Sequence, residues 1–183
     1  MFYKRMIEKY ILFKIVSNLR DGEYSVRGLS DKAGIGVATS KTYLDYLLSK
    51  GVVKRKIIGR SHLYSLDSTS FLARSIKTLI SLYELNESGI VKELVTKYPI
   101  NSIILYGSVA RGEDDSKSDI DILIISHRKI KISLKSERKL NRELSLIVYA
   151  LPEWKKKARE DKVFYDRVIV DGIPLYGEIP VVL

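Results

Sequence analysis

The sequence contains no cysteine and only two histidines among its 183 residues. Disulfide bonds and thiolate metal sites are therefore excluded, and His62 and His127 alone do not predict a zinc centre. The absence of cysteine favours a reducing, cytoplasmic setting. No apolar run reaches the roughly 18 residues of a membrane span, and residues 1–5 lack the apolar core of a signal peptide. We therefore expect a protein without a membrane segment.

Acidic residues are also in short supply, since 22 Asp and Glu face 32 Lys and Arg, which gives a formal net charge of +10. The excess is uneven along the chain. Residues 1–70 hold thirteen basic and six acidic residues, a net charge of +7, whereas the remaining residues reach only +3. A basic excess gathered in one segment predicts that this segment meets a polyanion.

The basic first segment has the pattern of three helices followed by two short strands. Apolar residues recur at helical spacing over residues 7–19, and further helices are predicted at 26–33 and 37–50. Two strand-like runs follow at 52–58 and 62–66, joined by a turn that contains glycine.

This layout resembles a winged helix-turn-helix domain, here over residues 1–67. The resemblance implies that the third helix enters the major groove of double-stranded DNA and that the ribbon lies along phosphate. The DNA contacts it implies are Thr39, Ser40, Lys41 and Tyr43 in the helix and Lys54, Arg55 and Arg60 in the ribbon. The alternative is that the same fold serves only packing or dimerisation.

The sequence pattern of residues 68–87 predicts a helix between the two halves of the chain. Asp67 to Ser70 read as a cap, and an apolar stripe runs from Phe71 to about Leu85, where residues 86–89 are expected to break the helix. Three roles are open for this helix: to connect two domains, to pair with its copy in a homodimer, or to begin the second domain. Winged-helix proteins commonly read DNA as symmetric dimers, which favours the homodimer.

The most informative motif is a pair of aspartates at i and i+2 in an apolar run. Asp119 and Asp121 alternate with isoleucines, so that on a strand both carboxylates project from one face. Two like charges held side by side are costly unless a cation lies between them. Carboxylate oxygens suit a hard cation, which predicts a site for Mg²⁺ or Mn²⁺.

A Gly-Ser turn stands before this strand, at the end of another apolar run. Gly107 permits a close approach of backbone to a ligand, and Ser108 offers a hydroxyl and an N–H at a predicted helix start. Arg111 lies three residues further on and is a candidate donor to phosphate. A triphosphate at the turn, with its metals on the aspartates, predicts phosphoryl or nucleotidyl transfer by two-metal chemistry.

At these residues the chain resembles the DNA polymerase beta nucleotidyltransferase superfamily, and in particular its minimal nucleotidyltransferases. The pattern is a Gly-Ser turn, a spacer, and Asp-x-Asp between apolar residues. The resemblance implies an α+β fold, with a small mixed sheet flanked by helices, over residues 88–183. It further implies that Asp119 and Asp121 are catalytic metal ligands and that Gly107, Ser108 and Arg111 bind a nucleoside triphosphate.

The third carboxylate of that superfamily is missing from its expected position. The neighbouring strand is predicted at residues 143–149, and Ser145 stands where the acid belongs. A serine neither holds a metal well nor acts as a base at neutral pH. Glu143 shares the strand face of Ser145 and is the candidate third catalytic acid, the alternative being an ordinary glutamate at the sheet edge.

Three functional hypotheses follow. The first is a DNA-binding protein that binds NTP with Mg²⁺ and transfers a nucleotidyl group to an unknown acceptor. The second is a transcription regulator whose transferase domain has lost turnover and serves as a nucleotide sensor or dimerisation unit. The third comes from the resemblance alone, because minimal nucleotidyltransferases can act as antitoxins that modify a helical partner protein of the HEPN type.

Overall fold

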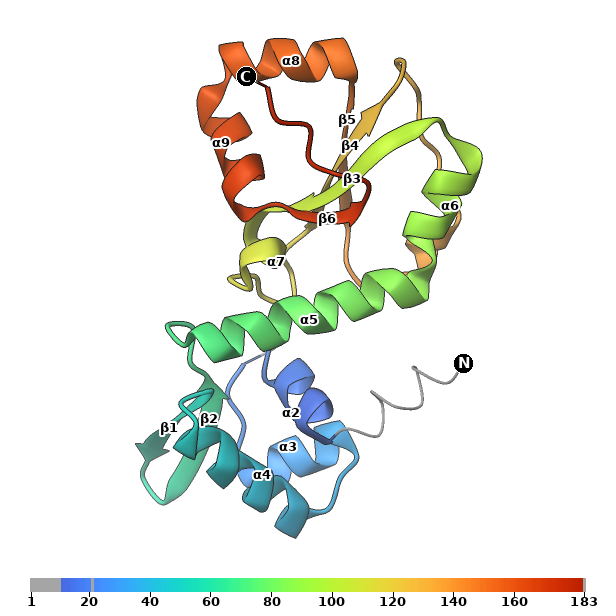
Figure 1. Ribbon diagram of the computed structural model, residues 1–183. Coiled ribbons are helices and arrows are strands. Elements are labelled where there is room, and N and C mark those ends of the chain that lie inside the picture. Colours follow the sequence, from blue (N-terminus) through green and yellow to red (C-terminus); the bar gives the residue numbers. More distant parts are fainter. Residues whose placement is uncertain (1–10, 21, 183) are drawn as a thin grey trace. The chain divides into compact units, whose positions relative to one another are not determined.

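The computed structural model describes residues 11–20 and 22–182 (Figure 1). The chain divides into two compact units, residues 1–80 and residues 81–183, and each is described here by itself. Part of the first predicted helix, residues 7–10, lies outside the described residues. No helix within the described ranges is long and apolar enough to cross a membrane.

The N-terminal unit contains three helices and a two-stranded antiparallel sheet. The helices are α2 (Ile11–Leu19), α3 (Val26–Ala33) and α4 (Val37–Ser49). The strands β1 (Val53–Ile58) and β2 (Ser61–Leu66) pair along their whole length. From residue 11 onward the order and type of these elements agree with the sequence prediction, and their ends differ from it by one residue at most.

Local signals set the ends of these helices. The Ser25 hydroxyl accepts a hydrogen bond from the N–H of Gly28, which caps α3. Gly34 ends α3 in the left-handed conformation, with φ of 62°. The helices and the ribbon enclose one apolar core, whose members include Ile15, Val16, Leu29, Leu44, Leu47, Val52, Val53 and Tyr64.

Helix α5 (Phe71–Ser88) is longer than the sequence predicts. Residues 86–88 continue the helix, because Asn, Glu and Ser are tolerated near a helix end, and the chain turns only at Gly89, where φ is 77°. Ala73 and Ile80 contribute to the core of the N-terminal unit, whereas Leu85 contributes to a core of the C-terminal unit. The division between the units thus falls within this helix.

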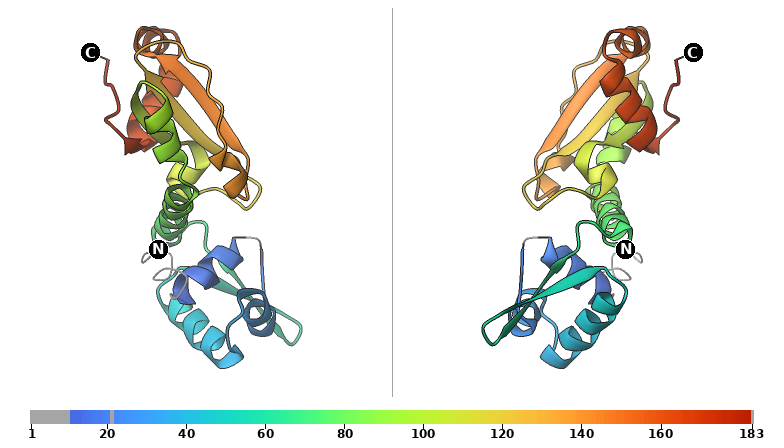
Figure 2. Two further views of the ribbon diagram at one scale, coloured as in Figure 1. Left: turned by 90° about the vertical axis from the view of Figure 1, so that its right-hand side faces the viewer. Right: turned by 90° about the vertical axis from the view of Figure 1, so that its left-hand side faces the viewer.

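The C-terminal unit is built on a four-stranded mixed sheet with the order β5-β4-β3-β6. Its strands are β3 (Ile100–Tyr106), β4 (Ile120–Ser126), β5 (Leu144–Ala150) and β6 (Ile173–Tyr176). Strand β3 is antiparallel to both β4 and β6, and β4 is parallel to β5. Figure 2 shows β5 at the outer border of the sheet. The unit is α+β with a mixed sheet, as the sequence indicates.

The remaining elements are α6 (Ile90–Lys97), α7 (Gly107–Arg111), the short 3-10 helix η1 (Ser136–Lys139), α8 (Leu151–Glu160) and α9 (Lys162–Asp171). Alternation along β3 and β4 supplies two cores, one on each face of the sheet. One core lies between the sheet and helices α8 and α9, and it includes Ile104, Leu123, Ile125, Trp154, Tyr165 and Val168. The other core lies between the sheet and α6, and it includes Ile90, Leu94, Ile103, Leu105, Ile122 and Ile124.

Candidate active site

The two aspartates lie at the end of the central sheet where α7 begins. Asp121 is aligned with Tyr106 of β3 on one side and with Ser145 of β5 on the other. Strand alternation places Asp121 on the sheet face that carries Leu123, which is the face covered by α8 and α9. Three neighbouring strands therefore converge on this carboxylate.

Burial raises the pKa of Asp121, and the charge of Asp119 raises it further. A hydrogen bond with the Ser145 side chain acts in the opposite direction and lowers this pKa. The contribution of Asp119 to this pKa indicates that its charge is felt at Asp121. A divalent cation between them would relieve both the repulsion and the desolvation of Asp121.

Gly107 lies against this carboxylate. Its φ is 76°, a conformation that side chains rarely adopt, and a Cβ atom at this position would lie 2.4 Å from Oδ2 of Asp121. Only glycine satisfies both conditions. The structure therefore brings Gly107 of the Gly-Ser turn against Asp121, although residues 108–120 lie between them along the chain.

Ser108 is partly exposed, and its carbonyl oxygen accepts a hydrogen bond of 2.9 Å from the N–H of Glu113, which folds the start of the spacer back onto α7. Arg111 is engaged by two carboxylates. Its Nε donates to Glu113 at 2.7 Å, and its Nη1 lies 3.5 Å from Oδ2 of Asp171. Since 36% of the Arg111 side chain is exposed, a phosphate would compete with these two acids for it.

Ser145 is aligned with Asp121, where the superfamily resemblance leads us to expect an acid, and Glu143 does not join the two aspartates as a third ligand. Glu143 is exposed and precedes β5, where its carbonyl oxygen accepts a hydrogen bond from the N–H of Ile120. Among the described residues no group of three or more His, Cys, Asp or Glu side chains is arranged to hold a metal. The structure therefore brings together the two aspartates but does not add Glu143 to them.

This donor set still fits a magnesium or manganese ion. Mg²⁺ is typically bound by one or two protein carboxylates, with water and substrate phosphates completing its shell. Asp119 and Asp121 supply the carboxylates, and burial together with the charge of Asp119 raises the pKa of Asp121, which a bound cation would offset. The residues that would hold the ion are these two aspartates, with Ser145 beside them.

Tyr106 is a site residue that sequence reasoning missed. Burial raises the pKa of its phenol to about 12, with contributions from Asp121 and Tyr149. Its ring meets Phe164 of α9 edge to face, at a centroid distance of 5.6 Å. The phenol thus stays protonated beside Asp121. The signal was available in the sequence, because Tyr106 is the last strand residue before the Gly-Ser turn.

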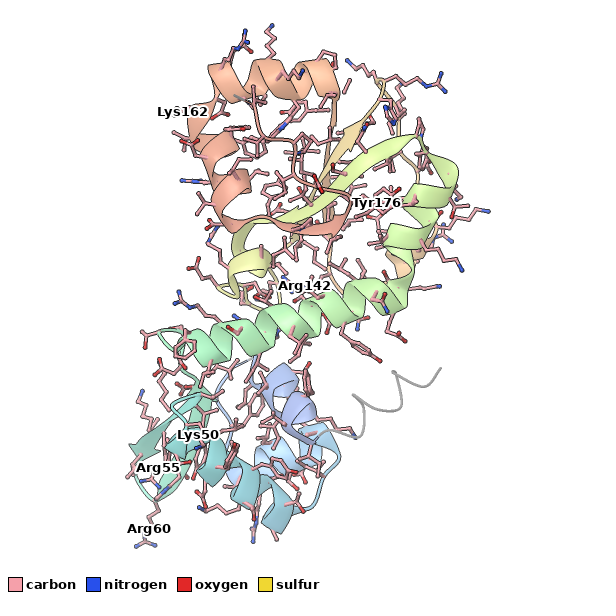
Figure 3. All side chains as sticks on the ribbon, in the orientation of Figure 1. Lys50, Arg55, Arg60, Arg142, Lys162 and Tyr176 are labelled. Atoms are coloured by element: carbon pink, nitrogen blue, oxygen red, sulfur yellow. The ribbon has the colours of Figure 1, made fainter. Side chains whose placement is uncertain are left out.

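A buried ion pair supports the same end of the sheet. Nη1 of Arg142 lies 2.8 Å from Oδ2 of Asp114, and the two side chains are 9% and 0% exposed. Nε of Arg142 also donates to the carbonyl oxygen of Ser118 at 2.7 Å. Figure 3 shows Arg142 near α7. No local signal predicts this pair, since its members are 28 positions apart in the chain.

The candidate DNA contacts of α4 differ in exposure. Lys41 is exposed and pairs with Asp45 at the next turn of the helix, whereas Thr39 is partly buried and Tyr43 packs against the core. Ser40 is fully buried, with 0% of its surface exposed. The expectation that Ser40 contacts DNA is therefore corrected, because Ser40 shares the inward face of the helix with Leu44 and Leu47.

The basic residues of the ribbon are all exposed. Lys54 and Arg55 lie on β1, and Arg60 follows Gly59 in the turn between the two strands. Figure 3 shows Arg60 pointing outward from the end of the ribbon. These side chains are accessible to a polyanion.

Comparison with known proteins bears on the C-terminal unit. Residues 87–170 match the protein family described as "Nucleotidyltransferase domain", and this range includes the Gly-Ser turn, both aspartates and Ser145. A protein of Methanocaldococcus jannaschii named "Putative protein adenylyltransferase MJ0126" is 42% identical over 57 residues. The match covers 31% of this chain, and the chain spans 57% of the length of this curated relative.

Solved structures show weaker likeness. A structure described as "a putative nucleotidyltransferase from Sulfolobus solfataricus" is 22% identical, with a TM-score of 0.37, over 57% of this chain and 87% of that one. Sso10a-2, a DNA-binding protein from the same organism, is 26% identical, with a TM-score of 0.34, over 48% of this chain and 90% of its own. These scores are too low to establish a shared fold.

Proposed function

We propose that the nucleotidyltransferase domain binds a nucleoside triphosphate with Mg²⁺ and transfers its nucleotidyl group to an acceptor hydroxyl. The observation that carries this proposal is the close approach of Gly107 to Asp121, with Asp119 as a second carboxylate. A Gly-Ser turn next to paired aspartates joins an anion-binding backbone to a cation-binding pair, which is the requirement for a metal-bound triphosphate.

Each residue has a role in this scheme. Asp119 and Asp121 would hold the metal, which would neutralise charge on the phosphates. Gly107 and Ser108 admit the triphosphate to the turn, and Arg111 exchanges one of its two carboxylate partners for a phosphate oxygen. The acceptor oxygen forms a bond to the α-phosphorus, the bond to pyrophosphate breaks, and the hydroxyl proton passes to a base or to water.

The absence of a third acid at Ser145 bears on the rate. A hydroxyl cannot accept the proton of the acceptor at neutral pH, and general-base catalysis typically contributes about 10²–10⁴-fold. Glu143, exposed immediately before β5, stays the candidate for this role. Slow transfer, with binding of the nucleotide retained, is the behaviour that this site supports.

The second candidate function, favoured by Ser145, is a regulator in which nucleotide binding persists without turnover. The name of the archaeal relative points to a protein as the acceptor and to ATP as the donor. For the enzyme, we accordingly propose adenylyl transfer to a side-chain hydroxyl of a protein. A helical partner of the HEPN type is the acceptor that the superfamily resemblance suggests.

The N-terminal unit is proposed to be a winged helix-turn-helix domain over residues 1–67 that binds double-stranded DNA. The order of α2, α3, α4, β1 and β2, the net charge of +7 over residues 1–70 and the exposed ribbon side chains support this proposal. A linker at 68–87 and a catalytic domain at 88–183 complete the proposed division. Homodimerisation through α5 stays a prediction, supported by its exposed apolar side chains Phe71, Leu72 and Leu79.

The test is incubation of the purified chain with α-labelled ATP, CTP, GTP or UTP, Mg²⁺ or Mn²⁺, and candidate protein acceptors. We expect labelled protein with the parent chain and none with Asp119→Asn/Asp121→Asn. The matched control is Asp166→Asn, which removes one exposed carboxylate from α9. The regulator is favoured if the parent binds Mg·ATP without transfer, and both functions are rejected if the double variant binds Mg·ATP as tightly as the parent.

A further inference from the structure

We propose that Arg142 is a positioning residue which, with Asp114, holds Asp119 and Asp121 in the arrangement that binds a divalent metal and the triphosphate. We call Arg142, Asp114 and the Ser118 carbonyl the Arg142 clamp. This inference deepens the proposed function and rests on it. Asp114, Ser118 and Arg142 lie within the range that matches the nucleotidyltransferase family, but they are outside the Gly-Ser and Asp-x-Asp motifs.

The first step is the geometry of the clamp. One guanidinium makes two directed hydrogen bonds from adjacent donors, Nη1 to Oδ2 of Asp114 at 2.8 Å and Nε to the carbonyl oxygen of Ser118 at 2.7 Å. Both acceptors belong to the spacer between α7 and β4. Because the guanidinium is planar and rigid, these bonds fix the two ends of the spacer loop relative to each other.

The second step is what lies next to the clamp along the chain. Ser118 is followed directly by Asp119, and Arg142 is followed by Glu143, whose carbonyl oxygen accepts the N–H of Ile120 at 2.9 Å. The clamp therefore joins the chain entering β4 to the chain entering β5. These are the two strands on which Asp121 meets Ser145, so a shift at Arg142 moves the carboxylates relative to their neighbours.

The third step concerns why a charged pair is found here. Burying two charges costs desolvation that their attraction only partly offsets, and apolar side chains can hold a loop as well. The Nη2 atom of Arg142 is also buried without a hydrogen-bond partner among the residues that the structure describes. A buried donor without a partner weakens the fold. The clamp is thus poorly explained by stability and well explained by directional control of the backbone beside Asp119.

The spacer is also ordered internally around the same point. The Ser118 hydroxyl donates to Oδ1 of Asp115 at 2.8 Å and accepts the N–H of Asp115 at 3.0 Å. Arg142 holds this small turn to the sheet through the Ser118 carbonyl. Removal of the guanidinium leaves the turn intact but free to shift, with Asp119 attached to its end.

The experiment measures Mn²⁺ binding to the full-length chain by electron paramagnetic resonance, at a temperature well below the unfolding midpoint of every variant. The variants are Arg142→Met, which removes both bonds, and Arg142→Lys, which keeps the charge but lacks the planar pair of donors. The control is Lys157→Met, which breaks a partly exposed ion pair of equal length, 2.8 Å, between Lys157 of α8 and Asp161 at the junction of α8 and α9. Thermal unfolding followed by circular dichroism is recorded for each.

We expect Arg142→Met to weaken Mn²⁺ binding by about 10–100-fold, the usual effect of removing a partner that orients a metal ligand. The Mn²⁺ affinity of Arg142→Lys is expected to lie between those of the parent and Arg142→Met. Lys157→Met is expected to bind Mn²⁺ as tightly as the parent does. The same order is expected for Mg·ATP affinity by calorimetry. Hydrogen exchange should increase in residues 114–120 of Arg142→Met and not elsewhere in the sheet.

Folded Arg142→Met that binds Mn²⁺ as tightly as the parent overturns the clamp and leaves the proposed function standing. If Arg142→Met does not fold, Arg142→Lys decides in its place, and parent-like affinity in that variant overturns the clamp. A parent chain whose Mn²⁺ affinity equals that of Asp119→Asn/Asp121→Asn overturns the proposed function, and the clamp with it. The two failures are therefore distinguishable.

Discussion

At the scale of single residues, the site depends on positions where the side chain is small or absent. Gly107 and Ser145 are the two such positions beside Asp121. The first is a glycine for steric reasons, and the second is a hydroxyl where related chemistry uses an acid. Each can be tested by one substitution.

Gly107→Ala is expected to abolish metal and nucleotide binding. Its Cβ would lie 2.4 Å from Oδ2 of Asp121, and the left-handed backbone adds about 1–2 kcal/mol of strain. The matched control is Gly89→Ala, because Gly89 has a φ of 77° but nothing within 4 Å of its Cβ position. Calorimetric titration with Mg·ATP and urea unfolding would separate the two effects. Nucleotide affinity in Gly107→Ala equal to that of Gly89→Ala would remove Gly107 from the site.

Ser145→Asp is expected to strengthen Mn²⁺ binding and to raise transfer by about 10²-fold or more, because it restores a carboxylate beside Asp121. Without metal, the same change should lower stability, since three carboxylates then repel one another. Ser145→Asn is the control of similar size without charge. Thermal unfolding at increasing metal concentrations would detect both the loss of stability without metal and the gain with it. If Ser145→Asp behaves as Ser145→Asn does, position 145 is not the place of the third carboxylate.

At the scale of elements, the Glu93 carboxylate of α6 binds the start of η1. Glu93 accepts hydrogen bonds from the backbone N–H groups of Lys135 at 3.0 Å and Ser136 at 2.9 Å, from the Ser136 hydroxyl and from Lys97. The bond from Lys97 is the largest cause of a lowered Glu93 pKa, followed by those from the 135–136 segment. Glu93 thereby anchors the long connection between β4 and β5, in which η1 lies.

The sign of the pH dependence follows from that lowered pKa. A carboxyl whose folded-state pKa lies below its ordinary value of 4.5 contributes stability above that value and loses it as the pH falls. We therefore expect hydrogen exchange in residues 135–139 to accelerate as the pH is lowered from 6 to about 3, after correction for the intrinsic rate. Glu93→Gln should show faster exchange already at pH 6 and little further change. A pH-independent profile in the parent would refute the anchor.

At the scale of the whole molecule, positive charge and the candidate active site lie in different parts of the chain. Residues 1–70 carry +7 of the net +10, whereas the carboxylate pair lies in residues 81–183. Each unit has a core of its own. Binding to a polyanion is therefore expected to depend on the first unit and to be independent of the aspartates.

Duplex DNA affinity is expected to fall steeply with salt, because phosphate contacts release counterions. Neutralising Arg60 or Lys54 with glutamine should reduce the slope of log K against log salt by about 1 for each phosphate that the variant no longer neutralises. The control is Lys155→Gln on α8, an exposed site in the other unit with the same change of charge. Fluorescence anisotropy at several salt concentrations would measure this, and a flat response in the parent would exclude DNA as the partner.

The sequence by itself determined the features that depend on short range. Strand alternation put Asp121 on the face of Leu123, helical spacing and caps marked α3 and α4, and the Gly-Ser turn marked the start of α7. Asp119 precedes β4, so its place on the same face stays a prediction. These signals act within a few residues, so they are visible without the fold. The missing acid at Ser145 was visible for the same reason, since its strand was identifiable from its apolar run.

Tertiary structure alone decided which distant groups meet. Only the strand register places Ser145 and Tyr106 beside Asp121, and only the folded spacer brings Asp114 to Arg142. It also turned Ser40 into the core and carried α5 to Ser88. The physical reason is that burial and pairing across the sheet are set by the packing of segments far apart in the chain, which no local pattern encodes.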